Sequence, residues 1–214
     1  MVVKRVMTPN PFTVFIDTPL SEAQALIRRE KVHRLPVLDK HKKLVGIISE
    51  KDLLYAAPSP ATTLNVYEMG ELLYKLKVEG IMTKKVITVT EDTLLEDAAR
   101  ILVDNDIGGL PVMREEHLVG IITESDIFKL FIELFGTRQR GMRVTLRLPD
   151  ELGEIARVTS AIAQAGGNII SLGTFPGDDP TNMICTTKVA GLGVEELREV
   201  CAPLVQEVMD IREA

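Results

Sequence analysis

The sequence predicts an α/β protein in two parts: a duplicated β-α-β-β-α unit that forms one module, and a smaller domain with the order β-α-β-β-α-β. Three observations predict this architecture. The stretch from Val45 reads VGIISEKDLL and the stretch from Val119 reads VGIITESDIF, so one unit occurs twice. From Met142 onward, apolar and polar residues alternate in a pattern that is typical of half-buried strands. The length of 214 residues suits one large or two small domains.

The two repeats match each other in the same order along their length. Met7-Thr8 aligns with Met82-Thr83, and Leu35-Pro36-Val37 aligns with Leu110-Pro111-Val112. Composition alone does not produce matches in a fixed order, so a whole unit has been duplicated. We expect a first repeat over residues 1–56, a linker with a helix over 57–77, and a second repeat over 78–136.

Each repeat is expected to form a short extended segment, a helix, a hairpin and a second helix. In the first repeat, Thr18 is a candidate N-cap, and apolar residues recur at helical spacing from Ala23 onward. A polar turn over 39–43 then joins the two strands of the hairpin. Thr93 and the residues after it repeat this pattern, and a helix over 66–77 leads into the second repeat.

The second helix of each repeat begins at a hydroxyl residue with an aspartate three positions later. These pairs are Ser49 with Asp52, and Thr123 with Asp126. In one interpretation the hydroxyl caps the helix and the carboxylate completes a capping box. In the other, the free N–H groups and the hydroxyl bind a phosphate, the carboxylate accepts both hydroxyls of a ribose, and an apolar slot takes a base. Duplication of the whole unit favours the nucleotide site.

The pattern Met-Thr, Thr-Val, Leu-Pro-Val and Val-Gly-Ile-Ile-Ser/Thr-x-x-Asp resembles the cystathionine-β-synthase-type domain, or CBS domain, over about residues 3–135. Tandem CBS domains form one module that binds adenine nucleotides. By this resemblance, Asp52 and Asp126 hold ribose hydroxyls, and Ser49 and Thr123 meet phosphate. The base slot would be lined by Thr13, Val14, Thr88 and Val89. Backbone groups along the nucleotide would come from His33, Arg34, Leu35, Pro36, Gly108, Gly109, Leu110 and Pro111.

The resemblance implies ATP, ADP, AMP or S-adenosylmethionine as the regulatory ligand and does not choose among them. The repeats differ beside the site, where the first has the cation Arg34 and the second has the uncharged pair Gly108-Gly109. Whether both sites are occupied therefore stays open. No metal is expected, because no cluster of histidine, cysteine and carboxylate residues has metal-ligand spacing.

A short polar linker over 137–141 precedes a second domain over 142–214. Alternating residues predict strands near Val144, Asn168 and Met183, and Gly166-Gly167 ends the helix between the first two. A helix from Val194 and a last strand complete the β-α-β-β-α-β order of a ferredoxin-like domain.

Two short motifs in this second domain resemble those of the ACT domain, a small regulatory module that often binds amino acids at a subunit interface. They are Pro149-Asp150-Glu151-Leu152-Gly153 and Gly167-Asn168-Ile169. The resemblance makes Asp150, Gly153, Asn168 and Ile169 the candidate effector site. The order CBS–CBS–ACT is similar to the acetoin-utilisation regulatory proteins of bacteria.

Composition and charge exclude several classes of function. The net charge of −6 gives no basic field for nucleic acid or an anionic membrane, and no stretch approaches the roughly 20 apolar residues of a membrane span. Cys185 and Cys201 have no CxxC spacing and are expected as buried thiols of a reducing, cytoplasmic compartment. The sequence has no G-x-S-x-G, P-loop or G-x-G-x-x-G motif, so an enzyme is not expected.

The sequence therefore predicts a non-catalytic sensor that binds an adenosyl ligand in the repeat pair. The signal would pass to the ACT domain or to a partner, and the resemblance implies a role in acetoin or acetyl-CoA metabolism. The helix with Phe128, Phe131 and Phe135 is apolar nearly all round, which favours a subunit or interdomain contact and a homodimer. The alternatives are a structural dimerisation module with vestigial nucleotide sites, and an enzyme.

Overall fold

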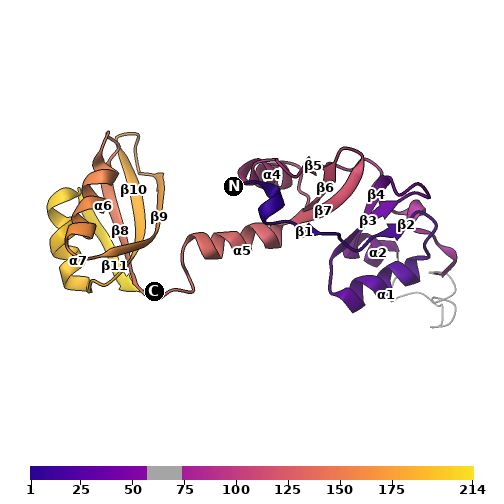
Figure 1. Cartoon of the computed structure of the whole chain (residues 1–214), viewed down its shortest axis with the longest axis horizontal. Helices are drawn as coiled ribbons and strands as arrows, with labels where there is room; N and C mark the ends of the chain where they lie inside the picture. The colour runs from indigo at the N-terminus through magenta and orange to yellow at the C-terminus, as the bar shows by residue number, and fades with distance from the viewer. Residues whose placement is uncertain (57–73) are drawn as a thin grey trace. The chain divides into compact units, whose positions relative to one another are not determined.

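The computed structural model describes residues 1–56 and 74–214, which form two compact units, Met1–Ile127 and Phe128–Ala214 (Figure 1). The predicted α/β class is confirmed. Of the helix predicted over 66–77, residues 66–73 lie outside the described residues, and residues 74 and 75 are helical. Helix α5 (Glu124–Leu134) begins in the first unit and ends in the second.

The first unit contains both repeats, each with the predicted order of elements. The first repeat has η1 (Val3–Arg5), β1 (Thr8–Pro9), β2 (Val14–Phe15), α1 (Leu20–Glu30), β3 (Arg34–Leu38), β4 (Leu44–Ser49) and α2 (Glu50–Ala56). The second repeat has η2 (Val78–Gly80), β5 (Val89–Thr90), α4 (Leu95–Asp104), β6 (Gly109–Arg114), β7 (His117–Thr123) and the start of α5. Strands β2-β3-β4 form one sheet, and β1-β7-β6-β5 form another.

The opening segment of each repeat completes the other repeat. Strand β1 pairs antiparallel with β7 of the second repeat, where Thr8 lies opposite Ile121. In the mirror arrangement, the N–H of Thr83 donates to the carbonyl of Ile47 at 2.9 Å, and the N–H of Ile47 donates back at 3.0 Å. Val78 of the second repeat is likewise fully buried in the core of the first. The two repeats are therefore one folding unit.

The glycine of each Val-Gly-Ile-Ile motif makes room for this exchange. A Cβ on Gly120 would lie 2.5 Å from the Sδ atom of Met7, and a Cβ on Gly46 would lie 2.4 Å from the Sδ atom of Met82. Both distances are far below van der Waals contact. The Met-Thr and Val-Gly-Ile-Ile motifs therefore recur together because they pack against each other across the two repeats.

The sequence prediction that threonines cap the first helices is wrong. Pro19 and Leu94 occupy the N-cap positions of α1 and α4, and neither helix has a side-chain cap. The hydroxyl of Thr18 instead accepts a hydrogen bond from the N–H of Phe15 at 3.0 Å, and Thr93 makes the equivalent bond with Thr90. These hydroxyls hold the turn between strand and helix, because proline or leucine follows them at the cap itself.

The second unit is an antiparallel sheet with helices on one face. Its elements are β8 (Met142–Pro149), α6 (Glu154–Gln164), β9 (Asn168–Pro176), β10 (Asn182–Ala190), α7 (Val194–Cys201), η3 (Ala202–Leu204) and β11 (Glu207–Glu213). The strand order is β11-β8-β10-β9, which confirms the predicted ferredoxin-like arrangement. Val144, Leu146, Val158, Ile162 and Leu197 form the buried core between sheet and helices.

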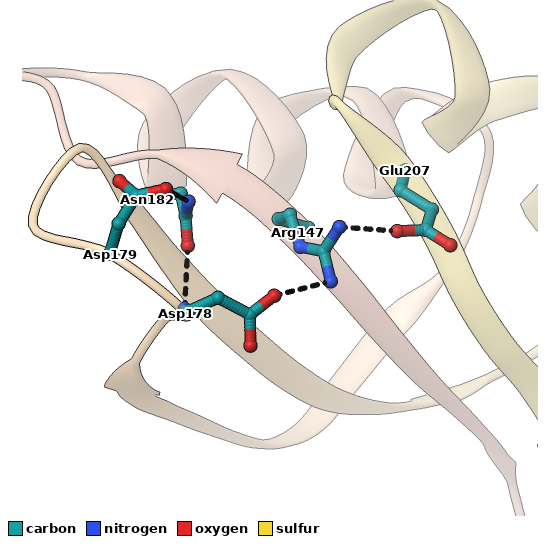
Figure 2. A network of polar contacts seen from close by, with 5 residues as sticks. All are labelled: Arg147, Asp178, Asp179, Asn182 and Glu207. Atoms are coloured by element: carbon teal, nitrogen blue, oxygen red, sulfur yellow. Dashed lines mark hydrogen bonds and ion pairs between the residues drawn. The ribbon is translucent and has the colours of Figure 1, made fainter.

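A polar network fixes the turn between β9 and β10 (Figure 2). The guanidinium of Arg147 contacts the carboxylates of Asp178 at 2.8 Å and Glu207 at 2.7 Å, so it links this turn to β11. The amide oxygen of Asn182 accepts from the N–H of Asp178 at 3.0 Å, and its amide nitrogen donates to Asp179 at 2.8 Å. Hydrogen bonds from the hydroxyl and N–H of Thr181 lower the pKa of Asp179.

We predict that Gly120→Ala destabilises the protein by about 1–3 kcal/mol, because the added methyl group displaces Met7 in a packed interface. Gly80→Ala is the matched control, since a Cβ at Gly80 has no heavy atom within 4 Å among the described residues. Urea denaturation of both variants measures the difference. Equal midpoints for Gly120→Ala and the wild type would show that the Met–Gly contact does not join the repeats.

Candidate functional site

A cavity of about 480 Å³ lies within the first unit and is lined by both repeats. The first repeat supplies the start of β3, the end of β4 and the first turn of α2. The second repeat supplies the segment before β5 and the segment before β6. Its lining includes Arg34, Ser49, Lys51, Asp52, Ile87 and Gly108. The exchange of opening segments assembles this cavity, because Thr83 is held on β4 and the residues after it form one wall.

The first turn of α2 is held by the predicted Ser-x-x-Asp pair. The Oδ2 atom of Asp52 accepts from the N–H of Ser49 at 2.8 Å and from its hydroxyl at 2.6 Å. The N–H of Asp52 lies 3.2 Å from the Ser49 Oγ, which accepts from it. This reciprocal pair has the form of a capping box. The capping interpretation is therefore realised in the structure, and the same residues line the cavity.

The second repeat has the same two hydrogen bonds to the aspartate carboxylate. The Oδ2 atom of Asp126 accepts from the N–H of Thr123 at 3.0 Å and from its hydroxyl at 2.7 Å. Asp126 is buried, with 7% of its surface exposed, whereas Asp52 is half-buried. The two aspartates therefore share one local geometry and differ in their access to solvent.

Arg34 makes the two halves of the module different. Its guanidinium lies against Gly108 and Gly109, where an added Cβ would come within 2.3 and 2.4 Å of the Nη atoms. Burial lowers the pKa of Arg34, and the nearby charge of Glu124 opposes this shift. Arg34 and Gly109 occupy equivalent positions, because they are the first residues of β3 and β6. The Arg34 side chain fills the space beside Gly109, so an arginine at both positions would not fit.

Other ionisable groups surround Arg34. Lys51 and Lys85 line the cavity and are exposed, and Asp106 lines it from the second repeat. The Nδ1 atom of His33 lies 3.1 Å from the Glu50 carboxylate. The cavity therefore offers cations and carboxylates to a ligand, beside apolar side chains.

The structure brings together six of the predicted site residues. His33, Arg34, Ser49, Asp52, Gly108 and Gly109 all line the cavity. Leu35, Pro36, Leu110 and Pro111 are buried within β3 and β6 directly after these residues. Thr123 and Asp126 occupy the equivalent positions of the second repeat and are not part of this lining.

The predicted base-slot residues lie elsewhere among the described residues. Thr13 and Val14 do not line the cavity, and Val14 is buried in the core of the first repeat. Thr88 and Val89 line a separate cavity of about 580 Å³. The apolar wall of the first cavity comes from Val86 and Ile87, one and two residues before Thr88. The sequence signal that could have identified Val86 and Ile87 is their position between the two repeat motifs Met82-Thr83 and Thr88-Val89.

The two ACT-like motifs lie at opposite ends of the second sheet. Asp150 follows β8, whose last residue Pro149 pairs with Asn182 at the start of β10. Asn168 pairs with Ala190 at the end of β10, about 27 Å further along that strand. Gly153 has φ +91° and precedes α6, and Ile169 packs against the core. The motifs are not brought together within one chain.

The described residues offer neither a metal site nor a membrane-spanning helix. No group of three or more histidine, cysteine or carboxylate side chains within residues 1–56 and 74–214 could hold a metal ion. Among the helices that the structure describes, none has the length and apolar character required to cross a membrane.

The fold and cavity define a duplicated α/β module with a cavity shared by its repeats, joined to a ferredoxin-like domain. The family model of the CBS domain matches residues 3–59 and 78–133, and the model of the TTHA0829-like ACT domain matches residues 140–212. The chain therefore belongs to the CBS-domain family and carries tandem CBS domains followed by a C-terminal ACT domain. The resemblance seen in the sequence is confirmed.

Solved structures match the CBS pair. The putative acetoin utilization protein AcuB from Vibrio cholerae is 30% identical, with TM-score 0.53, and 64% of this chain and 95% of that chain are covered. The CBS pair of protein MJ0100, in complex with 5-methylthioadenosine and S-adenosyl-L-methionine, is 29% identical, with TM-score 0.52 and coverage of 65% and 98%. CBSX2 in complex with AMP is 30% identical, with TM-score 0.51 and coverage of 64% and 98%.

We predict that Ser49→Ala lowers the free energy of unfolding by about 0.5–2 kcal/mol without any nucleotide, because it removes the capping hydroxyl. Ser125→Ala, at an exposed position within α5, is the control and should change it by less than about 0.5 kcal/mol. Chemical denaturation of the unliganded protein measures both. If the two variants unfold alike, the cap does not stabilise α2.

Proposed function

We propose that this protein is a non-catalytic regulatory sensor that binds an adenine nucleotide in the cavity of the CBS pair. The observation that carries the proposal is the placement of Asp52, Arg34 and Lys85 around one cavity that both repeats build. The complexes of MJ0100 with adenosyl ligands and of CBSX2 with AMP support it, because these CBS pairs are similar to this one.

The ribose is assigned to Asp52. Its Oδ2 atom accepts two hydrogen bonds from Ser49, which fixes the carboxylate and leaves its other oxygen to accept from ribose hydroxyls. A carboxylate can accept two such bonds, and a hydrogen bond to a charged group is worth about 1.5–3 kcal/mol. The cap therefore holds Asp52 in position to bind the ribose, and the capping role and the nucleotide role of the Ser49–Asp52 pair are compatible.

The base and phosphate are assigned to opposite kinds of side chain. Val86 and Ile87 give an apolar wall that suits a flat base. Arg34, Lys51 and Lys85 give cations for phosphate, and Arg34 can bind phosphate through two nitrogens. These cations favour AMP, ADP or ATP over the positively charged S-adenosylmethionine. The buried Asp126 and the Arg34 side chain against Gly108-Gly109 favour one nucleotide per pair.

The regulatory output is assigned to the ACT domain or a partner protein. Helix α5 begins at Glu124, whose charge acts on Arg34 in the nucleotide cavity, so a ligand that binds Arg34 can act on the start of this helix. A role in acetoin utilisation is supported by the similarity to AcuB of Vibrio cholerae. A cytoplasmic location is supported by the free, buried thiols of Cys185 and Cys201, whose pKa values are raised by burial.

We predict that Asp52→Ala weakens binding of AMP or ATP about 10- to 100-fold, because it removes the ribose contact. Asp104→Ala, at an exposed position in α4, should leave the affinity unchanged. Titration calorimetry with AMP, ATP and S-adenosylmethionine gives the affinities. Absence of binding for all three would leave the pair as a structural module with vestigial sites, and turnover of a bound nucleotide would make the protein an enzyme.

We also propose that the protein is a homodimer that pairs through α5. Phe128, Phe131 and Ile132 lie on one side of this helix and are exposed, with 67% of the Phe128 surface open to solvent. Three large apolar side chains at helical spacing form a face that water solvates poorly. A second copy of the helix would cover this face.

We predict that light scattering of the intact chain at micromolar concentration gives the mass of two chains, about 47 kDa from a chain of 23.7 kDa. Phe128→Glu should shift the mass toward one chain, because it places a charge in the apolar contact. A wild-type protein of one-chain mass would contradict the dimer.

A further inference from the structure

A second cavity, of about 380 Å³, lies within the unit Phe128–Ala214. It is on the sheet face opposite the helices α6 and α7, because Thr186 and Lys188 alternate along β10 with the core residues Cys185 and Val189. The end of α5 and the residues after it contribute Phe131, Phe135 and Thr137 to its lining. The strands and the final residue of the chain contribute Arg143, Ser171, Phe175, Thr186, Thr187, Lys188 and Ala214.

Lys188 is the unusual group in this cavity. Only 4% of its surface is exposed, and its ammonium group donates to the backbone carbonyl of Gly136 at 3.1 Å. An ammonium has three donors, and no carboxylate among the described residues pairs with Lys188. Burial of a charge costs several kcal/mol unless an opposite charge or hydrogen bonds offset it.

A second cation lies next to Lys188. Arg143 on β8 is its direct cross-strand partner, and like charges in this position repel each other. Arg143 is exposed. The pKa of Asp210 is lowered mainly by the hydrogen bonds that Arg212 donates to both oxygens of that carboxylate, and the positive charge of Arg143 contributes to the same shift. The cavity therefore carries two adjacent positive charges, and neither forms an ion pair in the part of the chain that the structure describes. The carboxylate of the final residue, Ala214, lies in the same lining and leaves both cations unpaired.

The remaining lining is apolar or already hydrogen-bonded. The rings of Phe131 and Phe135 lie with centroids 4.5 Å apart, and Phe135 stacks on Phe175 at 6.4 Å. The hydroxyl of Ser171 donates to the carbonyl of Phe135 at 3.3 Å, and that of Thr187 donates to the carbonyl of Ser171 at 2.9 Å. The site thus combines an aromatic wall with cationic groups whose donors are not all used.

We propose that this cavity binds a small monocarboxylate with an apolar body. The carboxylate accepts from Lys188 and Arg143, and the apolar body packs against Phe131, Phe135 and Phe175. A cavity of this volume and lining is in the range of small-molecule sites. The site differs from the nucleotide cavity and from the motifs at Asp150 and Asn168, so it does not depend on nucleotide binding. It shares Phe131 with the apolar face of α5 proposed for the dimer. Its ligand also contacts the end of α5.

The test compares 4-phenylbutyrate, octanoate and butyrate with their uncharged amides, by titration calorimetry on the full-length wild-type protein. We expect 4-phenylbutyrate and octanoate to bind at least tenfold more tightly than butyrate and than their own amides, because binding needs both the charge and the apolar body. This comparison uses no variant, so it does not depend on whether a mutated chain folds.

Lys188→Met keeps the length of the side chain and removes the charge. It should weaken binding of 4-phenylbutyrate tenfold or more and abolish the preference for the carboxylate over the amide. Arg198→Met, on α7 and exposed, is the matched control and should bind like the wild type. Equal affinities for carboxylate and amide, unchanged binding by Lys188→Met, or no binding of any carboxylate at millimolar concentration would each overturn the proposal.

Discussion

The first unit depends on the hydrogen-bonded exchange between the opening segment of each repeat and the last strand of the other. Thr8 pairs with Ile121, and Thr83 pairs with Ile47, so neither repeat has a complete sheet of its own. Gly46 and Gly120 permit the exchange because the methionine before each paired threonine packs directly on them. This constraint places residues 85–87 of the second repeat beside the Ser49–Asp52 cap of the first. The nucleotide cavity is therefore a consequence of how the two repeats are joined.

The sequence was sufficient to predict the duplication and the β-α-β-β-α order within each repeat, and it offered the caps at Ser49 and Thr123 as one of two interpretations. Hydrophobic periodicity is a local signal that predicts the type of each element. The duplication is found by aligning the chain with itself. The sequence did not predict that Ile87 rather than Val14 would face the cavity. That difference depends on the exchange of segments between repeats, which leaves no periodic signal. Thr18 likewise has the composition of an N-cap, but the proline after it takes the cap position.

Lys188 shows a different limit of sequence analysis. It occupies the polar side of an alternating strand, where a lysine is ordinarily solvated. Here Gly136 approaches from the end of α5 and Thr186 and Lys188 become buried on the face that α6 and α7 leave open. Long-range packing of a helix end on a sheet face is not encoded in strand alternation. The two cations Arg143 and Lys188 are adjacent only because β8 and β10 pair in this register, which the sequence alone does not give.

In the proposed complex, one nucleotide contacts both repeats at once. Amide hydrogen exchange of the full-length protein, with and without saturating AMP or ATP, detects these contacts in each repeat separately. We expect amide exchange to slow together at residues 49–52 of the first repeat and at residues 85–87 and 106–109 of the second, because all three segments line one cavity. Protection confined to a single repeat, or no protection in any of the three segments, would contradict it.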